Sequence, residues 1–180
     1  MNFPPITYPD QSVGSHYVNL KAARQAIEFA TPLLEAGMTD PNVVGSGFLY
    51  IVIMNPGLRP GQVTFEAAIL HEHAFGDRQR WDADYAAIAR AKARTSWLAG
   101  MDSYRLQEVS PHLLRDGDTL LAGGVWLDGI VVGVSGAFPC YDEVYANTIA
   151  SFLRALAREA RQAELERPVL QAMRPELIRS

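Results

Sequence analysis

Apolar and polar residues recur along the chain with two different periods, one typical of helices and one of strands. Three- and four-residue spacing predicts helices over residues 20–37, 83–99, 103–114 and 144–166. Pro32 is expected to kink the first helix or to end its regular part early, because proline removes a helical hydrogen bond. Pro111 is expected to break the third helix, which is the shortest of the four.

Two pairs of strands are expected between these helices. Residues 47–55 form a near-continuous apolar run, which is typical of a central strand covered on both faces. Residues 62–74 begin with alternating apolar and polar positions and are predicted to be its partner strand. Asp128-Gly129 joins two β-rich runs, residues 123–127 and 130–135, and this dipeptide is a strong signal for a two-residue hairpin.

The predicted order is helix, two strands, helix, short helix, two strands, helix. Paired hairpins separated by helices indicate an α+β protein with an antiparallel sheet flanked by helices, rather than a dinucleotide-binding fold. We expect a single domain over residues 19–166. We expect residues 1–18 to form an N-terminal arm, either disordered or packed on this subunit or a neighbour, and residues 167–180 to form a C-terminal tail whose apolar residues could pack on a partner.

Composition narrows the class of protein. The 180 residues are 48% hydrophobic and 20% charged, as in ordinary globular proteins, and the net charge of −4 without a basic cluster argues against nucleic acid as a partner. The longest apolar run, residues 47–54, is too short to span a membrane, and the start does not resemble a signal peptide. The single cysteine, Cys140, fits a reducing compartment. We therefore expect a cytoplasmic protein.

His71 and His73 are the candidate metal ligands. They lie two residues apart at the predicted strand end, so in an extended chain both project to one face, while Glu72 points away. Two imidazoles on one face could bind heme iron or a divalent metal, with Asp77 nearby as a further ligand. The alternative is a pair of solvated or hydrogen-bonded histidines, because two nitrogens alone do not close a metal site.

A glycine-rich segment suggests a family. Gly123-Gly124, Asp128-Gly129, Gly133 and Ser135-Gly136, together with the upstream run Lys92-Ala93-Arg94-Thr95, resemble the GlcG/HbpS-like proteins, a heme-binding or heme-degrading family of bacterial type. The resemblance covers roughly residues 19–165. It implies a profilin-like α+β fold, assembly into homo-oligomers, and a pocket that binds heme in some members.

The chain also departs from that family's pattern. His71-Glu72-His73 stands where the family has a different stretch, and Trp126 replaces a proline after the glycine pair. Residues 53–57 differ from the family's usual turn after the first central strand. None of the family's heme ligands maps cleanly onto a residue here, so the chain looks like a divergent member.

Further candidate ligand-binding residues lie in the matched segments. Lys92 could anchor a carboxylate or a heme propionate, or it could be an ordinary surface lysine of a helix. Four further positions are Gly123, Gly124, Ser135 and Gly136, whose backbone N–H groups could reach a ligand. Alternatively, the glycines could only shape the hairpin. Cys140 precedes a helix start, which could lower the pKa of its thiol, although an incidental cysteine is the more ordinary interpretation.

Two functions follow from these observations. The first is a small-ligand-binding protein of the GlcG/HbpS type that binds heme in a homo-oligomeric assembly. The alternative is an enzyme or accessory subunit of small-molecule catabolism, acting on organic acids or aromatic compounds, in which His71 and His73 bind a divalent metal or act as acid and base. A third interpretation is a scaffold whose arm and tail build the oligomer.

Overall fold

The computed structural model describes residues 15–165, so most of the predicted arm and all of the predicted tail lie outside the described part of the chain. The helices are α1 (Leu20–Met38), α2 (Tyr85–Ala99), α3 (Ser103–Val109) and α4 (Pro139–Ala163). The strands are β1 (Leu49–Met54), β2 (Ile69–Phe75), β3 (Gly124–Leu127) and β4 (Ile130–Ser135). Short 3₁₀ turns are η2 (Glu66–Ala68), η3 (Arg78–Arg80) and η4 (Pro111–Leu113).

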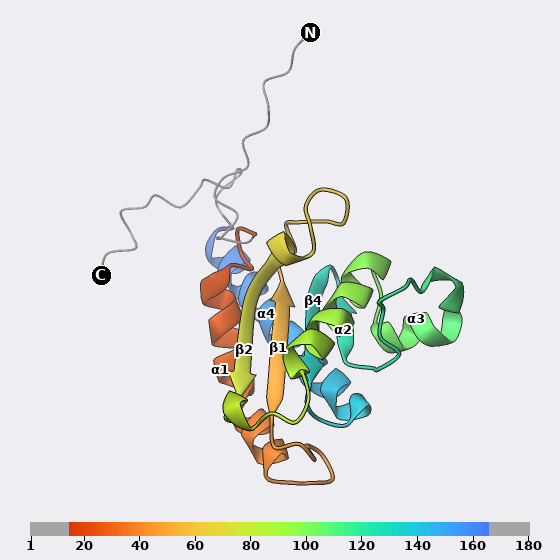
Figure 1. The fold of residues 1–180 in the computed structure, drawn as a ribbon. Helices are drawn as coiled ribbons and strands as arrows, with labels where there is room; N and C mark the ends of the chain where they lie inside the picture. The colour runs from red at the N-terminus through yellow and green to blue at the C-terminus, as the bar shows by residue number, and fades with distance from the viewer. Residues whose placement is uncertain (1–14, 166–180) are drawn as a thin grey trace.

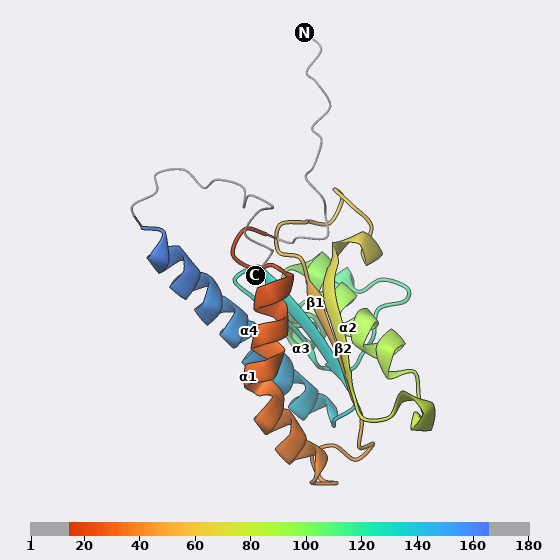
Figure 2. The same ribbon diagram turned by 90° about the vertical axis from the view of Figure 1, so that its left-hand side faces the viewer.

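The four strands form one antiparallel sheet in the order β2-β1-β4-β3. Helices α1 and α4 lie side by side on one face, and α2 covers the other (Figure 1). Turned by 90°, the molecule shows the three layers with β2 at the near edge of the sheet (Figure 2). The predicted α+β fold with an antiparallel sheet flanked by helices is confirmed. None of the helices in residues 15–165 is both long and apolar enough to cross a membrane.

The apolar run of β1 is continuous because this strand is covered on both faces. Leu49, Ile51 and Ile53 belong to the core under α1 and α4. Tyr50 and Val52 belong to the second core, under α2. All six residues of β1 are buried, so the central strand predicted from this run is confirmed.

Glycines allow α2 to lie unusually close to the hairpin. A Cβ on Gly133 would lie 2.5 Å from the carbonyl oxygen of Ala89 in α2, and a Cβ on Gly124 would collide with the carbonyl of Lys92. Gly136 has φ of 133° and would meet the carbonyl of Phe48. The glycine-rich signature thus has two causes: α2 leaves no room for a side chain at Gly124 and Gly133, and the backbone at Phe48 leaves none at Gly136.

The predicted partner strand over residues 62–74 is wrong in its first half. The strand is Ile69–Phe75, and the residues before it form the 3₁₀ turn η2. The Thr64 hydroxyl accepts a hydrogen bond from the Ala67 N–H, and the Ala68 N–H donates to the Phe65 carbonyl. Phe65 and Ala68 are both buried, so a helical three-residue spacing outweighs the apparent alternation.

The ends of two helices also differ from the prediction. Pro32 lies inside α1, which continues to Met38 rather than ending early. The last helix begins at Pro139, five residues before the predicted start at Val144. Proline suits the first helical turn because its missing N–H would have no intrahelical partner there. The carboxylate of Asp142 accepts a hydrogen bond from the Ala137 N–H and ties the preceding turn to the helix.

Candidate functional site

The histidine pair lies within β2 rather than at the end of the strand. His71 is paired with Ile53 and His73 with Ile51 across the β1–β2 ladder, so both side chains project to the face covered by α1. Their ring centroids are 6.3 Å apart, with an angle of 39° between the ring planes. Phe75 follows on the same face, and its ring makes an edge-on contact with His73 at 4.8 Å between centroids.

An open groove of about 360 Å³ runs between β2 and α1 beside the two imidazoles. The lining residues are Arg24, Ile27, Glu28, Thr31, His71 and His73. Both histidines are half-buried, so the groove gives a ligand access to the rings without leaving them fully in water. Arg24 and Glu28 of α1 carry opposite charges, so the groove has no strong net charge.

The environment of the groove favours neutral imidazoles. Burial lowers the pKa of His73 below its ordinary value of 6.5. Burial also lowers the pKa of His71, and the nearby charges of His73 and Arg24 lower it further, against a smaller opposing effect of Glu72. A neutral imidazole keeps a lone pair for a metal or a proton, so the pair is in its ligating form at neutral pH.

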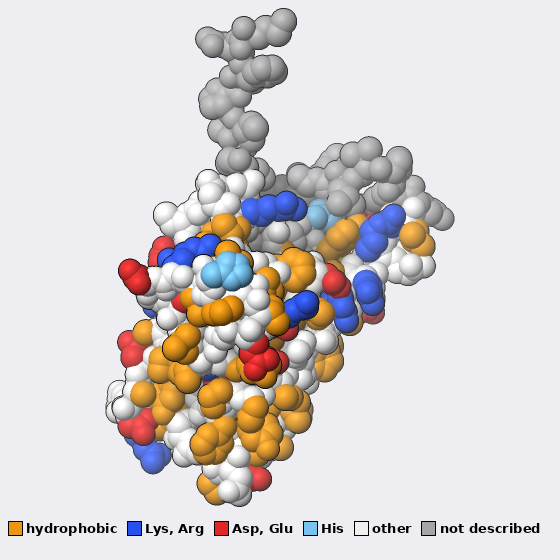
Figure 3. Space-filling view, turned by 90° about the vertical axis from the view of Figure 1, so that its right-hand side faces the viewer, with side chains coloured by type: hydrophobic (Ala, Val, Ile, Leu, Met, Phe, Trp, Pro, Cys, Tyr) orange, Lys and Arg blue, Asp and Glu red, His pale blue; other side chains and the backbone are white. Residues whose placement is uncertain are grey.

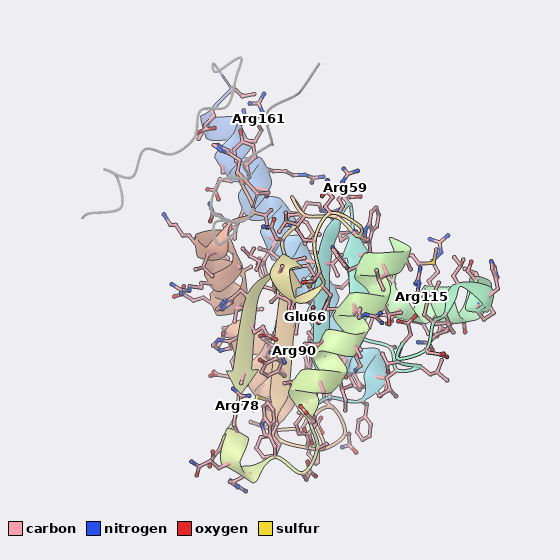
Figure 4. All side chains as sticks on the ribbon, turned by 45° about the horizontal axis from the view of Figure 1, so that its top comes forward. Arg59, Glu66, Arg78, Arg90, Arg115 and Arg161 are labelled. Carbon is pink, nitrogen blue, oxygen red and sulfur yellow. The ribbon has the colours of Figure 1, made fainter. Side chains whose placement is uncertain are left out.

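Glu72 is held away from the groove, on the opposite face of β2. Both oxygens of its carboxylate accept hydrogen bonds from Arg90 of α2, at 2.7 Å from Nε and 2.8 Å from Nη2. Arg90 extends from α2 over the sheet (Figure 4). Asp77, the other predicted carboxylate neighbour, accepts from the Gln79 N–H and begins the turn η3. Over residues 15–165 no three His, Cys, Asp or Glu side chains are placed to hold a metal, so one copy offers two nitrogens.

Lys92 lies in the interior, where its ammonium donates to the Asp142 carboxylate at 2.6 Å. The side chains of both residues are only 1–2% exposed. Burial raises the pKa of Asp142 to about 6 and lowers the pKa of Lys92, while their mutual attraction opposes both shifts. The ion pair therefore joins α2 to the first turn of α4 across the core.

Among the predicted glycine and serine positions, Gly123 lies directly against that ion pair. Gly123 would place a Cβ 2.7 Å from the Cβ of Asp142 and 3.0 Å from the Nζ of Lys92. Ser135 is buried at the end of β4 and is paired with Tyr50. These residues lie toward the β4–β3 side of the sheet, whereas His71 and His73 lie on the opposite edge strand. The structure thus separates the predicted ligand-binding residues from the predicted metal ligands.

A second open groove, of about 510 Å³, lies between α3 and the start of α4. It is lined by Tyr104, Gln107, Leu120, Ala122, Pro139, Cys140 and Glu143. Burial, and then the charge of Asp102, raise the pKa of Glu143. Seen from the α3 side, the surface carries many hydrophobic side chains at this end of the molecule (Figure 3). Of these lining residues only Cys140 was singled out from the sequence. The groove itself was not predicted, because it is formed by segments that lie far apart along the chain.

No protein-family model and no curated protein matches the sequence. Two solved structures are similar over most of their length. HbpS of Streptomyces reticuli, solved as a double mutant, has a TM-score of 0.50 and 22% identity, over 84% of this chain and 97% of that one. The protein ORFY of Klebsiella pneumoniae, of family model DUF336, has a TM-score of 0.51 and 16% identity, over 83% of this chain and 99% of that one. This chain has the HbpS fold.

The fold implied by the resemblance to GlcG/HbpS-like proteins is thus confirmed. A third structure, a PduOC:heme complex, has a TM-score of 0.46 and 18% identity, over 78% of this chain and 94% of that one. Within the HbpS fold, sequence reasoning missed Asp142 as the partner of Lys92. The signal available for it was an acidic residue in the first turn of the last helix, which has several ordinary explanations.

Proposed function

We propose that this chain is a small-ligand-binding protein of the GlcG/HbpS type whose groove between α1 and β2 takes a metal-centred ligand on His71 and His73. The observation that carries this proposal is the pair of half-buried imidazoles on one face of β2, with ring centroids 6.3 Å apart. Burial lowers the pKa of both rings, which supports the ligating form. Glu72 takes no part, because Arg90 holds it on the other face.

A divalent ion suits both imidazoles better than heme does. Both imidazoles could hold a zinc-class ion together, since histidine nitrogens are among the ligands that zinc prefers and the two ring centroids are 6.3 Å apart on one strand face. Heme would be held by one of the two imidazoles, because both lie on the same strand face. Heme on one imidazole is the second candidate, supported by Ile27 in the groove lining, by the contact of Phe75 with His73 and by the resemblance.

Zinc titrated into the purified full chain is expected to bind, and His71→Ala or His73→Ala is expected to weaken binding more than about 100-fold, since even outer-shell partners of a metal cost 10–100-fold. Calorimetry measures the affinity. His112→Ala is the matched control, because His112 lies in the exposed turn η4 and is expected to bind zinc as the unmodified chain does. Zinc affinity unchanged after loss of both His71 and His73 would exclude this site.

Hemin separates the second candidate from the first. If one imidazole holds heme, added hemin gives a shifted Soret band that disappears with one of the two alanine variants and survives the other. A shifted band that persists in the double variant His71→Ala/His73→Ala would place heme elsewhere on the protein. The zinc titration on the same samples then decides whether the pair binds an ion, heme or neither.

Metal affinity is expected to fall in acid. Metal competes with protons for each imidazole, so affinity drops about tenfold per pH unit for each ring once the pH is below its pKa. Since burial sets both pKa values below 6.5, the loss begins below pH 6.5 and not above it. Zinc titrations between pH 5 and pH 8 test this. An affinity that already falls about tenfold per pH unit between pH 8 and pH 7 would contradict the lowered pKa values of the two imidazoles.

The proposal includes assembly into a homo-oligomer. Phe29 and Leu33 of α1 are 49% and 48% exposed, and Val144 of α4 is 51% exposed, which leaves apolar surface on the two helices that cover one face of the sheet. Such surface supports contact with another copy of the chain. Sedimentation of the full chain is expected to give a mass above that of one copy, and a strictly monomeric particle at all concentrations would exclude assembly.

A further inference from the structure

Among residues 15–165, strand β2 ends the sheet with an unpaired edge. In the described part of the chain its only strand partner is β1, so the outward N–H and C=O groups of β2 face no further strand. Edge strands are usually protected by lysine, proline, a β-bulge or a covering element; β2 contains neither lysine nor proline, and its bulge lies at Leu70, outside the stretch from His71 to Phe75. Helix α1 lies over one face of β2 and leaves the edge itself facing the viewer in Figure 2. Such an edge can pair with a strand of another chain.

The sequence of this edge is self-complementary about Glu72. A two-fold axis through Glu72 in an antiparallel pair places His71 opposite the partner's His73, and His73 opposite the partner's His71. A β-bulge at Leu70 ends the regular part of the strand, since Ile53 pairs with His71 and Met54 with Ile69. The paired stretch is therefore short, and backbone hydrogen bonds alone would hold it weakly.

That arrangement brings four imidazoles to one face. Directly opposite residues of an antiparallel pair have Cβ atoms about 5 Å apart, so the imidazoles of the two copies would be neighbours on this face. Four nitrogen ligands close a tetrahedral site, whereas the two of one copy do not. Glu28 of α1 lines the same groove, but over residues 15–165 of a single copy no three His, Cys, Asp or Glu side chains are placed to hold a metal, so the second copy is needed to complete the site.

The charges at the same contact are compatible with pairing. On the opposite face the axis brings Glu72 against the partner's Glu72, and like charges there would repel. Each carboxylate is already neutralised by its own Arg90, through two hydrogen bonds of 2.7 and 2.8 Å. In the groove, Arg24 and Glu28 of α1 offset one another beside the imidazoles.

We propose that two copies of this chain pair through β2 and that His71 and His73 of both copies bind one divalent transition metal of the zinc class between them. The inference rests on the proposed function, because it uses the same histidine pair as metal ligands. It adds the second copy as the source of the missing ligands, and it makes this contact dependent on metal, since the strand pairing is short.

Zinc and EDTA test the pairing on the full chain. Light scattering after size exclusion is expected to show the particle mass doubling when zinc replaces EDTA, and bound-metal analysis is expected to give one zinc for every two chains. His73→Ala is expected to abolish the doubling. One zinc per chain with no change in mass would overturn the pairing and leave the proposed function standing. No zinc bound at all would overturn both.

A cysteine at the axis provides a second measurement, which detects the contact itself rather than the particle mass. In a Cys140→Ser background, Glu72→Cys places one thiol opposite its copy, and mild oxidation in the presence of zinc is expected to give a disulfide-linked dimer. Asp116→Cys is the control, because Asp116 is exposed in the segment between α3 and β3, and β3 is the opposite edge strand of the sheet from β2. Cross-linking no faster with Glu72→Cys than with Asp116→Cys would overturn the pairing.

Discussion

Asp142→Asn is expected to lower the free energy of unfolding by about 3–5 kcal/mol, the usual cost of removing one partner of a buried ion pair. The substitution keeps the shape of the side chain and leaves the Lys92 ammonium without a counter-charge at a position that is 1% exposed. Urea unfolding at pH 7 measures the effect. Lys92→Met is expected to cost a similar amount, because it leaves the carboxylate of Asp142 unpaired in the core.

An exposed ion pair provides the matched control. Arg154 donates to Asp128 at 2.8 Å, with side chains 34% and 66% exposed, so Arg154→Met is expected to cost no more than about 1 kcal/mol. Replacing both buried partners, as in Lys92→Met with Asp142→Leu, is expected to recover much of the loss, since no lone charge remains. Equal losses for Asp142→Asn and Arg154→Met would contradict a structural role for the buried pair.

Gly136→Ala is expected to be the most damaging single-methyl change in the hairpin segment. The φ of 133° at Gly136 costs an L-residue about 1–3 kcal/mol, and the new Cβ would also collide with the Phe48 carbonyl, which belongs to the backbone. A backbone atom cannot move away by changing rotamer as a side chain can. The chain segments at the ends of β1 and β4 must therefore move apart. Thermal unfolding by circular dichroism is expected to show a large fall in Tm.

Two other glycines separate the causes. Gly129 has φ of 90° with nothing within 4 Å of a Cβ, so Gly129→Ala measures the cost of the backbone conformation alone. Gly133 has no positive φ but lies against Ala89 and Ala93, so Gly133→Ala measures the cost of the close approach of α2. If Gly136→Ala costs no more than Gly129→Ala, close contact does not explain the glycine at position 136.

The parts of the fold that depend on local sequence patterns could be predicted. The apolar run of β1 and the Asp128-Gly129 turn depend on neighbours along the chain, and both predictions match the structure. The stretch before β2 differs from the prediction because Val63, Phe65, Ala67 and Ile69 alternate as in a strand, whereas the buried residues are Phe65 and Ala68, three apart as in a helical turn. The Ala67 N–H donates to the Thr64 hydroxyl within that turn. The local pattern alone does not distinguish a strand from a 3₁₀ turn in this stretch.

The candidate site, too, could be predicted only where it depends on local sequence. A period of two predicted that His71 and His73 share one face of a strand, and the structure places them so. Whether that strand is central or at an edge depends on the order β2-β1-β4-β3, which the sequence does not reveal. The partner of Lys92 was equally hidden, because Asp142 is fifty residues away along the chain and meets it only when α2 and α4 pack across the glycine hairpin.

The most direct test of the account is X-ray absorption at the zinc edge on the zinc-loaded full chain. We predict a first shell of imidazole nitrogens at about 2.0–2.1 Å, which is lost in the double variant His71→Ala/His73→Ala and kept in His112→Ala. The same imidazole shell in the double variant, or a shell of oxygen ligands only in the unmodified chain, would contradict the assignment of the metal to the groove between α1 and β2.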